Sequence, residues 1–298
     1  MYIIKKIKYL LSRYQSFKQN PLTKHNPSLY FIKFIYINFL LYVFSKEVKF
    51  TFLNNIKVAA KKGDGIIGNY HSVLQEPKDS IFLLHFLRNT STFVDIGANV
   101  GHYTLLASII SKSNVISIEP VYNTFQRLKN NLKLNNIEKN VELLNIGLSD
   151  KPGKLFFSDK LFTTNKVSLN NKGTEITVNV LDNICKNKEI EIIKIDVEGY
   201  EWFVLNGAKE ILKSDAMKVI IIELNDSGLN FGINDSQIIT FLNDLGYKQY
   251  EYNIFNRDLK IINYKNNTQF NTLFIKDVDY VIDRVKNAEN IKFSNFNL

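Results

Sequence analysis

The stretch Phe93-Val-Asp-Ile-Gly-Ala-Asn-Val-Gly-His-Tyr103 decides the fold. It begins with an apolar run that is typical of an inner strand in a parallel sheet, because both faces of such a sheet are covered. Gly97 and Gly101 then allow the backbone to turn sharply and to approach a ligand closely. The residues that follow, up to Ile110, carry apolar side chains at helical spacing. A strand that leads through a glycine turn into a helix N-terminus predicts a site for a nucleoside cofactor.

A second buried strand follows at residues 114–118 and ends at Glu119, 18 residues after Gly101. A carboxylate at this place can accept hydrogen bonds from both ribose hydroxyls, as the acid about 20 residues beyond the glycines does in dinucleotide-binding folds. The loop, however, has the spacing G-x-x-x-G, whereas the loop that cradles a pyrophosphate has G-x-G-x-x-G. The pattern therefore favours a nucleoside cofactor over a dinucleotide.

Four motifs in sequence order resemble one family of enzymes. Besides residues 94–101 and 118–120, they comprise residues 145–150 with 180–182, and residues 192–201 with 204–208. Together they resemble the FkbM family of O-methyltransferases, in the class I methyltransferase superfamily, from residue 91 to residue 225. The resemblance implies a doubly wound α/β fold with a mostly parallel, seven-stranded, Rossmann-like sheet. It also implies S-adenosyl-L-methionine as the cofactor.

The resemblance further implies which residues bind the cofactor. In that family the glycine loop holds the methionine end, and the acid after the second strand holds the ribose. The candidate cofactor ligands are therefore Asp95, Gly97, Ala98, Asn99, Gly101, Tyr103, Glu119, Pro120, Asn145, Gly147 and Asp196. Ligands of such sheets bind at the carboxyl ends of the strands, so the acids and Asn145 should become neighbours. As alternatives, Asp95 could only brace the glycine loop, Asn145 could cap its strand, and Asp196 could begin the next helix.

Methyl transfer from a sulfonium to oxygen is an in-line displacement, which positioning of the acceptor and exclusion of water promote. An alcohol also gains from losing its proton to a carboxylate or an imidazole. Glu198 is the first choice for acceptor binding or for this base, with Asp196 and then His102 as further candidates. Glu198 could instead be a first-turn carboxylate that the helix dipole stabilises. Tyr200 and Glu201 are expected to shape the acceptor pocket.

The composition indicates one catalytic domain with an added segment. The chain has 298 residues, more than the usual ~100 to 200 of one domain. Cys185 is the only cysteine, which favours a reducing compartment, and we expect a cytoplasmic protein. The histidine and cysteine spacing does not suggest zinc. Asp196, Glu198 and Glu223 would suit Mg²⁺, but nothing in their spacing demands it, and we predict no metal.

Basic residues concentrate at the N-terminus. Residues 1–50 contain eight lysines and one arginine against the single acid Glu47, which accounts for +8 of the net charge of +9. Apolar residues between Ile3 and Phe17 recur at helical spacing, mostly opposite the charges. Residues 29–44 are apolar but include Lys33, and they fall short of the ~20 residues that span a bilayer. These helices suit either peripheral contact with the inner face of a membrane or packing against the domain or a second subunit. A nucleic-acid arm is not favoured, because the lysines lie opposite an apolar stripe.

The rest of the chain alternates strands and helices, as a doubly wound sheet requires. We expect strands at 141–146, 190–195, 218–224, 247–252 and 272–275, helices at 121–136, 201–214 and 236–245, and hairpin strands at 154–158, 166–169 and 175–180. The chain then divides into a basic, apolar helical extension (1–75), an FkbM-type methyltransferase domain (76–285) and a C-terminal tail (286–298).

The sequence thus predicts an S-adenosylmethionine-dependent O-methyltransferase (EC 2.1.1.-). Its acceptor is expected to be a hydroxyl-bearing small molecule or glycan, such as a sugar of a surface glycan or a secondary metabolite, and not a nucleic acid. A non-catalytic nucleoside-binding or scaffold protein that keeps the fold is the alternative. Whether the chain forms a homo-oligomer stays open.

Overall fold

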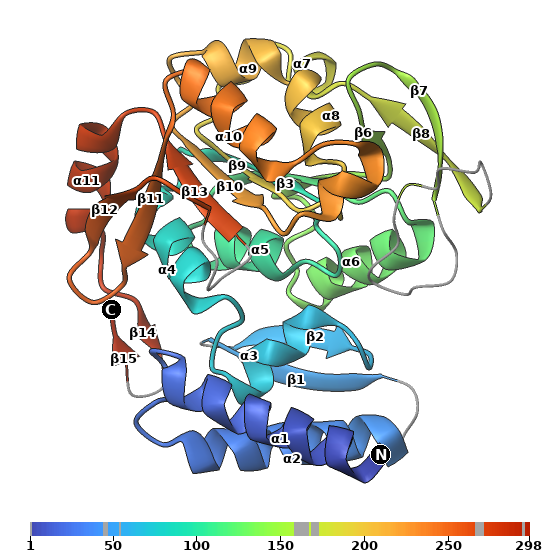
Figure 1. Cartoon of the computed structure of the whole chain (residues 1–298), viewed down its shortest axis with the longest axis vertical. Helices are drawn as coiled ribbons and strands as arrows, with labels where there is room; N and C mark the ends of the chain where they lie inside the picture. The colour runs from blue at the N-terminus through green and yellow to red at the C-terminus, as the bar shows by residue number, and fades with distance from the viewer. Residues whose placement is uncertain are drawn as a thin grey trace.

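The computed structural model describes residues 2–43, 47–53, 55–157, 167, 173–265, 271–293 and 296–298. Its centre is a sheet of eight strands in the order β12-β11-β13-β10-β9-β3-β4-β5 (Figure 1). The strands are β3 (Thr92–Ile96), β4 (Asn114–Ile118), β5 (Val141–Leu144), β9 (Ile192–Ile195), β10 (Val219–Glu223), β11 (Lys248–Asn253), β12 (Asp258–Ile262) and β13 (Asn271–Ile275).

The strand directions confirm the predicted fold class. Strands β5, β4, β3, β9 and β10 run parallel to one another, and β13 pairs antiparallel with β10, as the reversed last strand of a class I methyltransferase does. The sheet has eight strands where seven were expected, because β11 turns back through residues 254–257 to pair with β12 at the edge. Most side chains of β12 are exposed, so its sequence lacks the apolar run that marks the inner strands.

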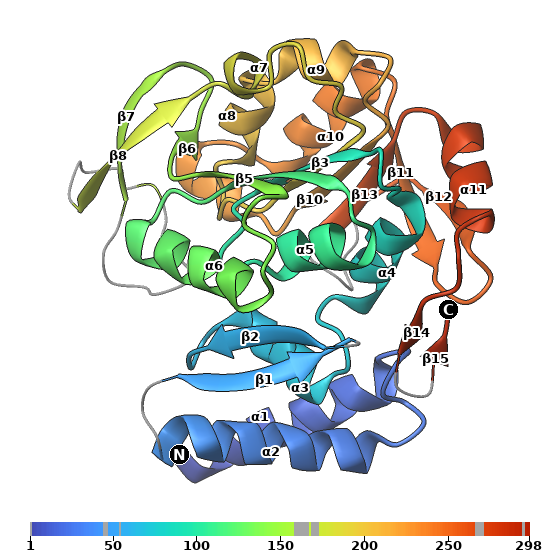
Figure 2. The ribbon, with the colours of Figure 1, turned by 180° about the vertical axis from the view of Figure 1, so that it is seen from behind.

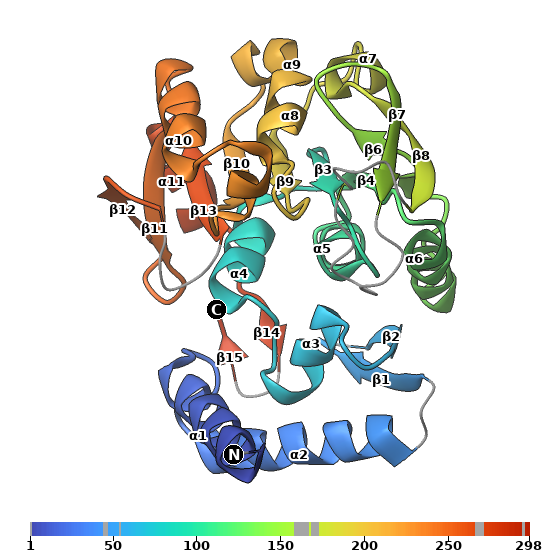
Figure 3. The same ribbon diagram turned by 45° about the vertical axis from the view of Figure 1, so that its right-hand side comes forward.

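Helices cover both faces of the sheet (Figure 3). On one face lie α4 (Pro77–Phe86), α5 (His102–Leu105), which continues as a π-helical segment (Leu106–Ile110), and α6 (Tyr122–Leu134). On the other lie α7 (Leu181–Ile184), α8 (Glu201–Asn206), α9 (Lys209–Lys213) and α10 (Asp235–Asp244), while α11 (Val278–Lys286) packs against α4. The single helix expected at 201–214 is split at Gly207. A Cβ on that residue would lie 2.1 Å from the carbonyl oxygen of Ser149, so the backbones touch there.

A small second sheet stands beside the main one. It contains β6 (Gly147–Leu148), β8 (Thr174–Asn179) and β7 (Gly153–Phe157), in that order, with β7 antiparallel to β8. Two of the three expected hairpin strands, 154–158 and 175–180, correspond to β7 and β8 within a residue or so. The third, 166–169, lies outside the described residues except for Val167, which bridges to Phe157.

The N-terminal segment begins with the two expected helices, α1 (Tyr2–Gln19) and α2 (Pro27–Val43). The structure adds a hairpin that the sequence did not suggest, β1 (Val48–Phe52) with β2 (Ile56–Ala60), followed by a short 3₁₀ turn (Gly65–Ile67) and α3 (Gly68–His71). Figure 2 shows this hairpin between α2 and α6. Its edge is paired by amide side chains of α6, since Asn131 Oδ1 accepts the Ala59 N–H at 2.9 Å and Asn135 Oδ1 accepts the Lys57 N–H at 2.9 Å. Near the C-terminus, β14 (Lys292–Phe293) pairs with β15 (Phe296–Asn297).

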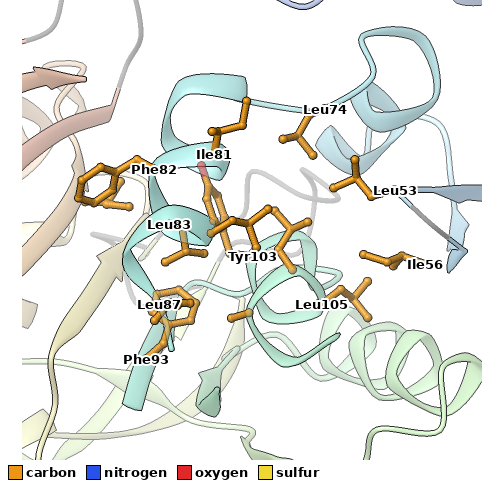
Figure 4. Packing of buried hydrophobic residues seen from close by; sticks show 14 of the residues in the cluster. Leu53, Ile56, Leu74, Ile81, Phe82, Leu83, Leu87, Phe93, Tyr103 and Leu105 are labelled. Carbon is orange, nitrogen blue, oxygen red and sulfur yellow. The ribbon is translucent and has the colours of Figure 1, made fainter. Parts of the chain in front are cut away.

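One hydrophobic core joins the N-terminal segment to the sheet. The cluster runs from Ile56 and Leu74, through Ile81 of α4, to Phe93 of β3 and Leu105 of α5 (Figure 4). The segment before residue 76 is therefore packed as part of the same body as the sheet. None of the described helices combines the length and the apolar character that crossing a bilayer demands.

Candidate active site

A cavity lies at the carboxyl ends of β3, β4, β9 and β10, where a doubly wound sheet binds its ligands. The expected site residues that line it are Asp95, Gly97, Ala98, Asn99, Tyr103, Glu119, Pro120, Gly147, Asp196 and Glu198. Gly101 and Asn145 were predicted as ligands but do not line it; Asn145 instead contacts the backbone of Glu119 and Pro120, which do. The cavity is also lined by residues that were not predicted to bind the cofactor or the acceptor, among them Gln75, Glu76, Lys194 and Glu223.

The two glycines of the loop are required by packing. Gly97 has φ +78°, and a Cβ there would lie 1.9 Å from the carbonyl oxygen of Asp196 on the neighbouring strand. Gly101 has φ +100°, and its Cβ would lie 2.6 Å from Leu128 Cδ1 of α6. The loop is also tied to β4, because the N–H groups of Gly97 and Ala98 donate to the carbonyl oxygen of Ile118 at 3.0 and 3.1 Å. The glycine spacing therefore fixes the shape of the cavity wall.

Asp95 is buried directly beneath this loop. Its Oδ2 accepts a hydrogen bond from Thr104 Oγ1 of α5 at 2.6 Å, which ties the end of β3 to the helix. Burial raises the pKa of Asp95 to about 6, while the Thr104 hydroxyl and Lys194 oppose the shift. Asp95 thus braces the loop and faces the cavity at the same time.

Glu119 organises the end of β4. Its Oε2 accepts the N–H of Asn99 at 3.0 Å, and its Oε1 accepts the N–H of Val121 at 2.9 Å. Burial raises the pKa of Glu119 to about 7 against these two donors. Behind it, Asn145 Nδ2 donates to the carbonyl oxygens of Glu119 and Pro120 at 2.9 and 3.0 Å. Asn145 therefore acts on the backbone that carries Glu119.

A buried lysine accompanies the acids at the end of β9. Lys194 Nζ donates to Asp196 Oδ2 at 2.8 Å and lies 4.9 Å from the centre of the Tyr103 ring. Burial lowers the pKa of Lys194, but the carboxylates of Asp196 and Glu76 outweigh it and raise the pKa, so the ammonium stays charged. The signal in the sequence is a lysine between isoleucines in an otherwise apolar inner strand. Such a residue needs a buried anionic partner.

The turn after β9 has an unusual backbone. Glu198 has φ 56° and Gly199 has φ 102°, both in the left-handed region that few non-glycine residues adopt. The buried carboxylate of Glu201 holds this turn, since its Oε1 accepts the N–H groups of Val197 and Gly199, each at 3.1 Å. Burial raises the pKa of Glu201 to about 7. Glu201 thus shapes the turn from behind, while Glu198 and Tyr200 line the cavity.

Glu223 ends β10 and faces the same space. Burial, followed by the charges of Asp196 and Glu198, raises the pKa of Glu223 to about 9, so its carboxyl is protonated at neutral pH. The sequence had suggested this residue only as part of a Mg²⁺ site with Asp196 and Glu198. Among the described residues, no group of three or more His, Cys, Asp or Glu side chains is arranged to hold a metal ion.

His102 joins the glycine loop to the N-terminal segment. Its Nδ1 accepts from Asn69 Nδ2 at 3.0 Å, because Asn69 Oδ1 is already engaged by the N–H of Gln75. The Nε2 proton then points to Ser80 Oγ, at 2.9 Å. Burial lowers the pKa of His102 to about 3, so the ring is neutral. With both ring nitrogens engaged, His102 is a structural residue and a poor candidate for the base.

The N-terminal segment supplies one wall of the cavity. Gly65 and Ile66 line it, as do Gln75 and Glu76. Glu76 Oε2 accepts from the Tyr103 hydroxyl at 2.5 Å and from Asn271 Nδ2 at 3.1 Å, so this wall is bonded to α5 and β13. No motif covers these residues, and only the folded structure identifies them, through their place in the cavity wall and the contacts of Glu76 with Tyr103 and Asn271.

Two buried side-chain oxygens in the cavity wall accept no hydrogen bond from the described residues. Asn99 Oδ1 and Gln75 Oε1 are buried and have no hydrogen-bond partner within the described part of the chain. Buried acceptors without partners are costly in folded proteins, and a donor group of a ligand in this cavity would satisfy these two. Hydroxyl and ammonium groups of a nucleoside and amino acid ligand are suitable donors. The surplus of carboxyls over the single Lys194 also suits a cationic ligand.

The sequence of this region matches a known family. The model of the methyltransferase FkbM domain matches residues 95–249, just over half of the chain. The chain belongs to the FkbM methyltransferase family. Its cofactor is accordingly S-adenosylmethionine, and the FkbM region runs from Asp95 near the end of β3 past β10, with every acid of the cavity except Glu76. The unpartnered acceptors and the acidic wall fit this cofactor.

Curated relatives are similar over part of their length. Hexuronic acid methyltransferase AglP from Haloferax volcanii is 31% identical over 137 residues, which are 44% of this chain and 54% of that protein. Methyltransferase 1 from Beauveria bassiana is 27% identical over 169 residues, 47% of this chain and 67% of that protein. The chain thus spans between about half and two thirds of the length of these relatives.

Solved structures resemble the chain more distantly. An rRNA methylase from Streptococcus thermophilus has a TM-score of 0.40 and 15% identity, covering 73% of this chain and 99% of that one. A Streptococcus mutans protein in complex with S-adenosylhomocysteine has a TM-score of 0.42 and 15% identity, covering 67% and 96%.

Proposed function

We propose that the chain transfers the methyl group of S-adenosylmethionine to a hydroxyl group, most directly that of a sugar in a surface glycan, with a secondary metabolite as the other acceptor class. One observation carries the proposal. Carboxyl groups at the ends of four adjacent strands, including Glu119 and Glu198, surround a single cavity in an FkbM-family chain. The sugar is supported by the name of the relative AglP, a hexuronic acid methyltransferase.

Glu119 is proposed to hold the ribose of the cofactor. Each of its carboxylate oxygens already accepts one backbone N–H and can accept a second donor. Asp95 and the loop from Gly97 to Gly101 would hold the methionine end, with the unpartnered Asn99 Oδ1 as an acceptor for a donor group. Tyr103, Pro120, Asn145 and Gly147 complete the proposed cofactor site, Asn145 by holding the backbone of Glu119.

The chemistry needs an activated oxygen beside an electrophilic methyl group, which the sulfonium of the cofactor supplies. Glu198 is proposed to accept the proton of the acceptor hydroxyl or to orient that hydroxyl. Its left-handed backbone, fixed by Gly199 and Glu201, sets the direction of its side chain. Asp196, oriented by the hydrogen bond from Lys194 Nζ at 2.8 Å, is proposed to accept a donor group of the cofactor. Glu223 is proposed to donate a hydrogen bond to the acceptor, because its raised pKa keeps its proton in place.

The proposed catalytic unit is larger than the matched family region. Gln75 and Glu76 line the cavity, so the proposed boundary between the extension (1–75) and the methyltransferase domain (76–285) passes through its wall. A cytoplasmic location is proposed as well. It is supported by the one cysteine, Cys185, which is buried and free.

The test is methyl transfer from label-carrying S-adenosylmethionine to a panel of acceptors. The panel contains neutral saccharides, saccharides with uronic acids, a hydroxylated small molecule, protein and RNA. We expect label in at least one hydroxyl-bearing small molecule or saccharide, and little with Glu198→Gln. Label only in protein or RNA would refute the proposal. Tight binding of S-adenosylhomocysteine without transfer to any acceptor would instead support a non-catalytic binding protein.

A further inference from the structure

The outer face of α2 is a large exposed apolar surface. Tyr30, Phe34, Ile37 and Leu41 of this helix are buried against the rest of the protein. On the remaining face, Leu29, Ile32, Ile35, Tyr36, Phe39, Tyr42 and Val43 are each between 43% and 76% exposed. A helix that is apolar all round is normally covered on all sides. The exposed side of α2 is therefore expected to be covered by a second surface.

Helix α1 extends this surface. It contacts the rest of the protein through Leu10, Tyr14 and Phe17, and Tyr14 packs edge-on against Phe31 of α2 at 5.5 Å. Ile7 and Leu11 lie seven and three residues before Tyr14, on the same side of the helix. The exposed row of Ile4, Ile7 and Leu11 thus borders the exposed face of α2. We call these ten residues of the two helices the apolar face.

The surroundings of the apolar face are basic. Neither α1 nor α2 contains an acidic residue, whereas α1 carries four lysines and Arg13, and α2 carries Lys33. Arg13, Lys18 and Lys33 each lie over an aromatic ring of the pair of helices, with centroid distances of 5.1 to 5.7 Å. Mixed apolar, aromatic and basic side chains on helices are typical of segments that lie in the interface of an anionic bilayer.

We propose that the apolar face docks on an anionic lipid surface, with α1 and α2 lying in the plane of the headgroups. Charge decides between this occupant and a second copy of the chain. Two copies would bring two groups of basic residues together with no acid of α1 or α2 to pair with them. An anionic bilayer offers both an apolar layer for the ten side chains and negative charge for the lysines.

Docking in this way has a consequence for the cavity. Helix α2 packs against α3, which leads into the loop that carries Gln75 and Glu76 (Figure 3). The layer that would meet the lipid is thus directly connected to one wall of the cavity. The docking proposal itself does not depend on the identity of the methyl acceptor.

The test is flotation of the full chain with vesicles of phosphatidylcholine alone and of equal parts phosphatidylcholine and phosphatidylglycerol. The perturbing variant is Ile35→Glu/Phe39→Glu. The matched control is Ile261→Glu/Tyr264→Glu, which adds the same charge at side chains 55% and 57% exposed, away from the apolar face. Melting temperature and affinity for S-adenosylhomocysteine, expected to be unchanged in both variants, show that each is folded.

We expect the native chain and the control to float with the anionic vesicles, and less so at high salt because screening weakens charge attraction. Binding by Ile35→Glu/Phe39→Glu should fall by about tenfold or more. Failure of the native chain to bind anionic vesicles would overturn the proposal, and so would equal binding by both variants. Sedimentation velocity provides a third test. If the native chain is a dimer and Ile35→Glu/Phe39→Glu is a monomer, the apolar face contacts a second copy and the proposal is refuted.

Discussion

Replacement of Glu119 by glutamine should weaken cofactor binding about a hundredfold. The carboxylate accepts the N–H groups of Asn99 and Val121 at 3.0 and 2.9 Å, and it is proposed to accept two ribose hydroxyls. An amide keeps one acceptor oxygen and turns an NH₂ group toward a backbone donor. A hydrogen bond to a charged group contributes about 1.5 to 3 kcal/mol. The loss of one such bond and the weakening of another, about 3 kcal/mol, corresponds to roughly a hundredfold in affinity.

The pH dependence provides a second signature of Glu119. Its pKa is about 7 in the free protein, and only the ionised form accepts from both hydroxyls. Affinity of the native chain should therefore fall by up to about tenfold for each pH unit below 7, until other groups titrate. The glutamine variant lacks this carboxyl, so its affinity should change much less with pH around 7, the remaining change coming from Asp95 and Glu201.

The assay is isothermal calorimetry with S-adenosylhomocysteine on either side of that pKa. Glu142→Gln is the matched control, because Glu142 lies on the same sheet, pairs with Lys188 at 2.6 Å on the surface, and does not line the cavity. Affinity of Glu119→Gln within about threefold of native, in a variant that melts normally, would refute the assignment of Glu119 to the ribose.

Three further predictions concern the loop, the turn and the buried acids. Gly97→Ala should lower the unfolding free energy by about 3 kcal/mol or more, since its Cβ would lie 1.9 Å from a backbone oxygen at φ +78°, whereas Gly153→Ala, with no atom within 4 Å, should not. Thermal denaturation compares the two, and equal melting would contradict the packing argument. Glu198→Gln should lower kcat about a hundredfold at unchanged affinity for S-adenosylhomocysteine, and native turnover in this variant would remove Glu198 from the mechanism. Glu201 and Glu223, with pKa values raised to about 7 and about 9, keep protons in the folded chain that the unfolded chain has lost. The melting temperature without cofactor should therefore fall as pH rises from about 7.5 to 9, above the range in which unfolded histidines titrate, and a rise over this window would contradict the burial of these acids.

The fold could be predicted because its inner strands are short apolar runs that end in acids. Strands β4, β9 and β10 end at or just before an acid, β3 carries Asp95 one residue before its end, and the G-x-x-x-G loop fixes the connection of β3 to α5. Strand β12 was not predicted from the sequence, because its side chains are mostly exposed. The hairpin of β1 and β2 was not predicted either, because part of its backbone pairing comes from Asn131 and Asn135 of α6, more than 70 residues away in sequence.

The site could be predicted only where it follows the strand ends. Asp95, Glu119, Asp196 and Glu198 meet at one cavity because parallel strands end at the same edge of a sheet. Gln75 and Glu76 lie outside the motifs and line the cavity through tertiary packing. No local sequence pattern predicts such packing. The raised pKa of Glu223 likewise depends on burial beside Asp196 and Glu198.

The most direct test of the account follows the methyl carbon itself. The full chain is incubated with S-adenosylmethionine labelled at the methyl carbon and with the saccharide that accepts label best, and the product is examined by carbon NMR. The account predicts the chemical shift of a methyl group bound to oxygen, with one molecule of S-adenosylhomocysteine released for each methyl transferred. Label bound to nitrogen or carbon, or tight binding of S-adenosylhomocysteine with no labelled product, would contradict it.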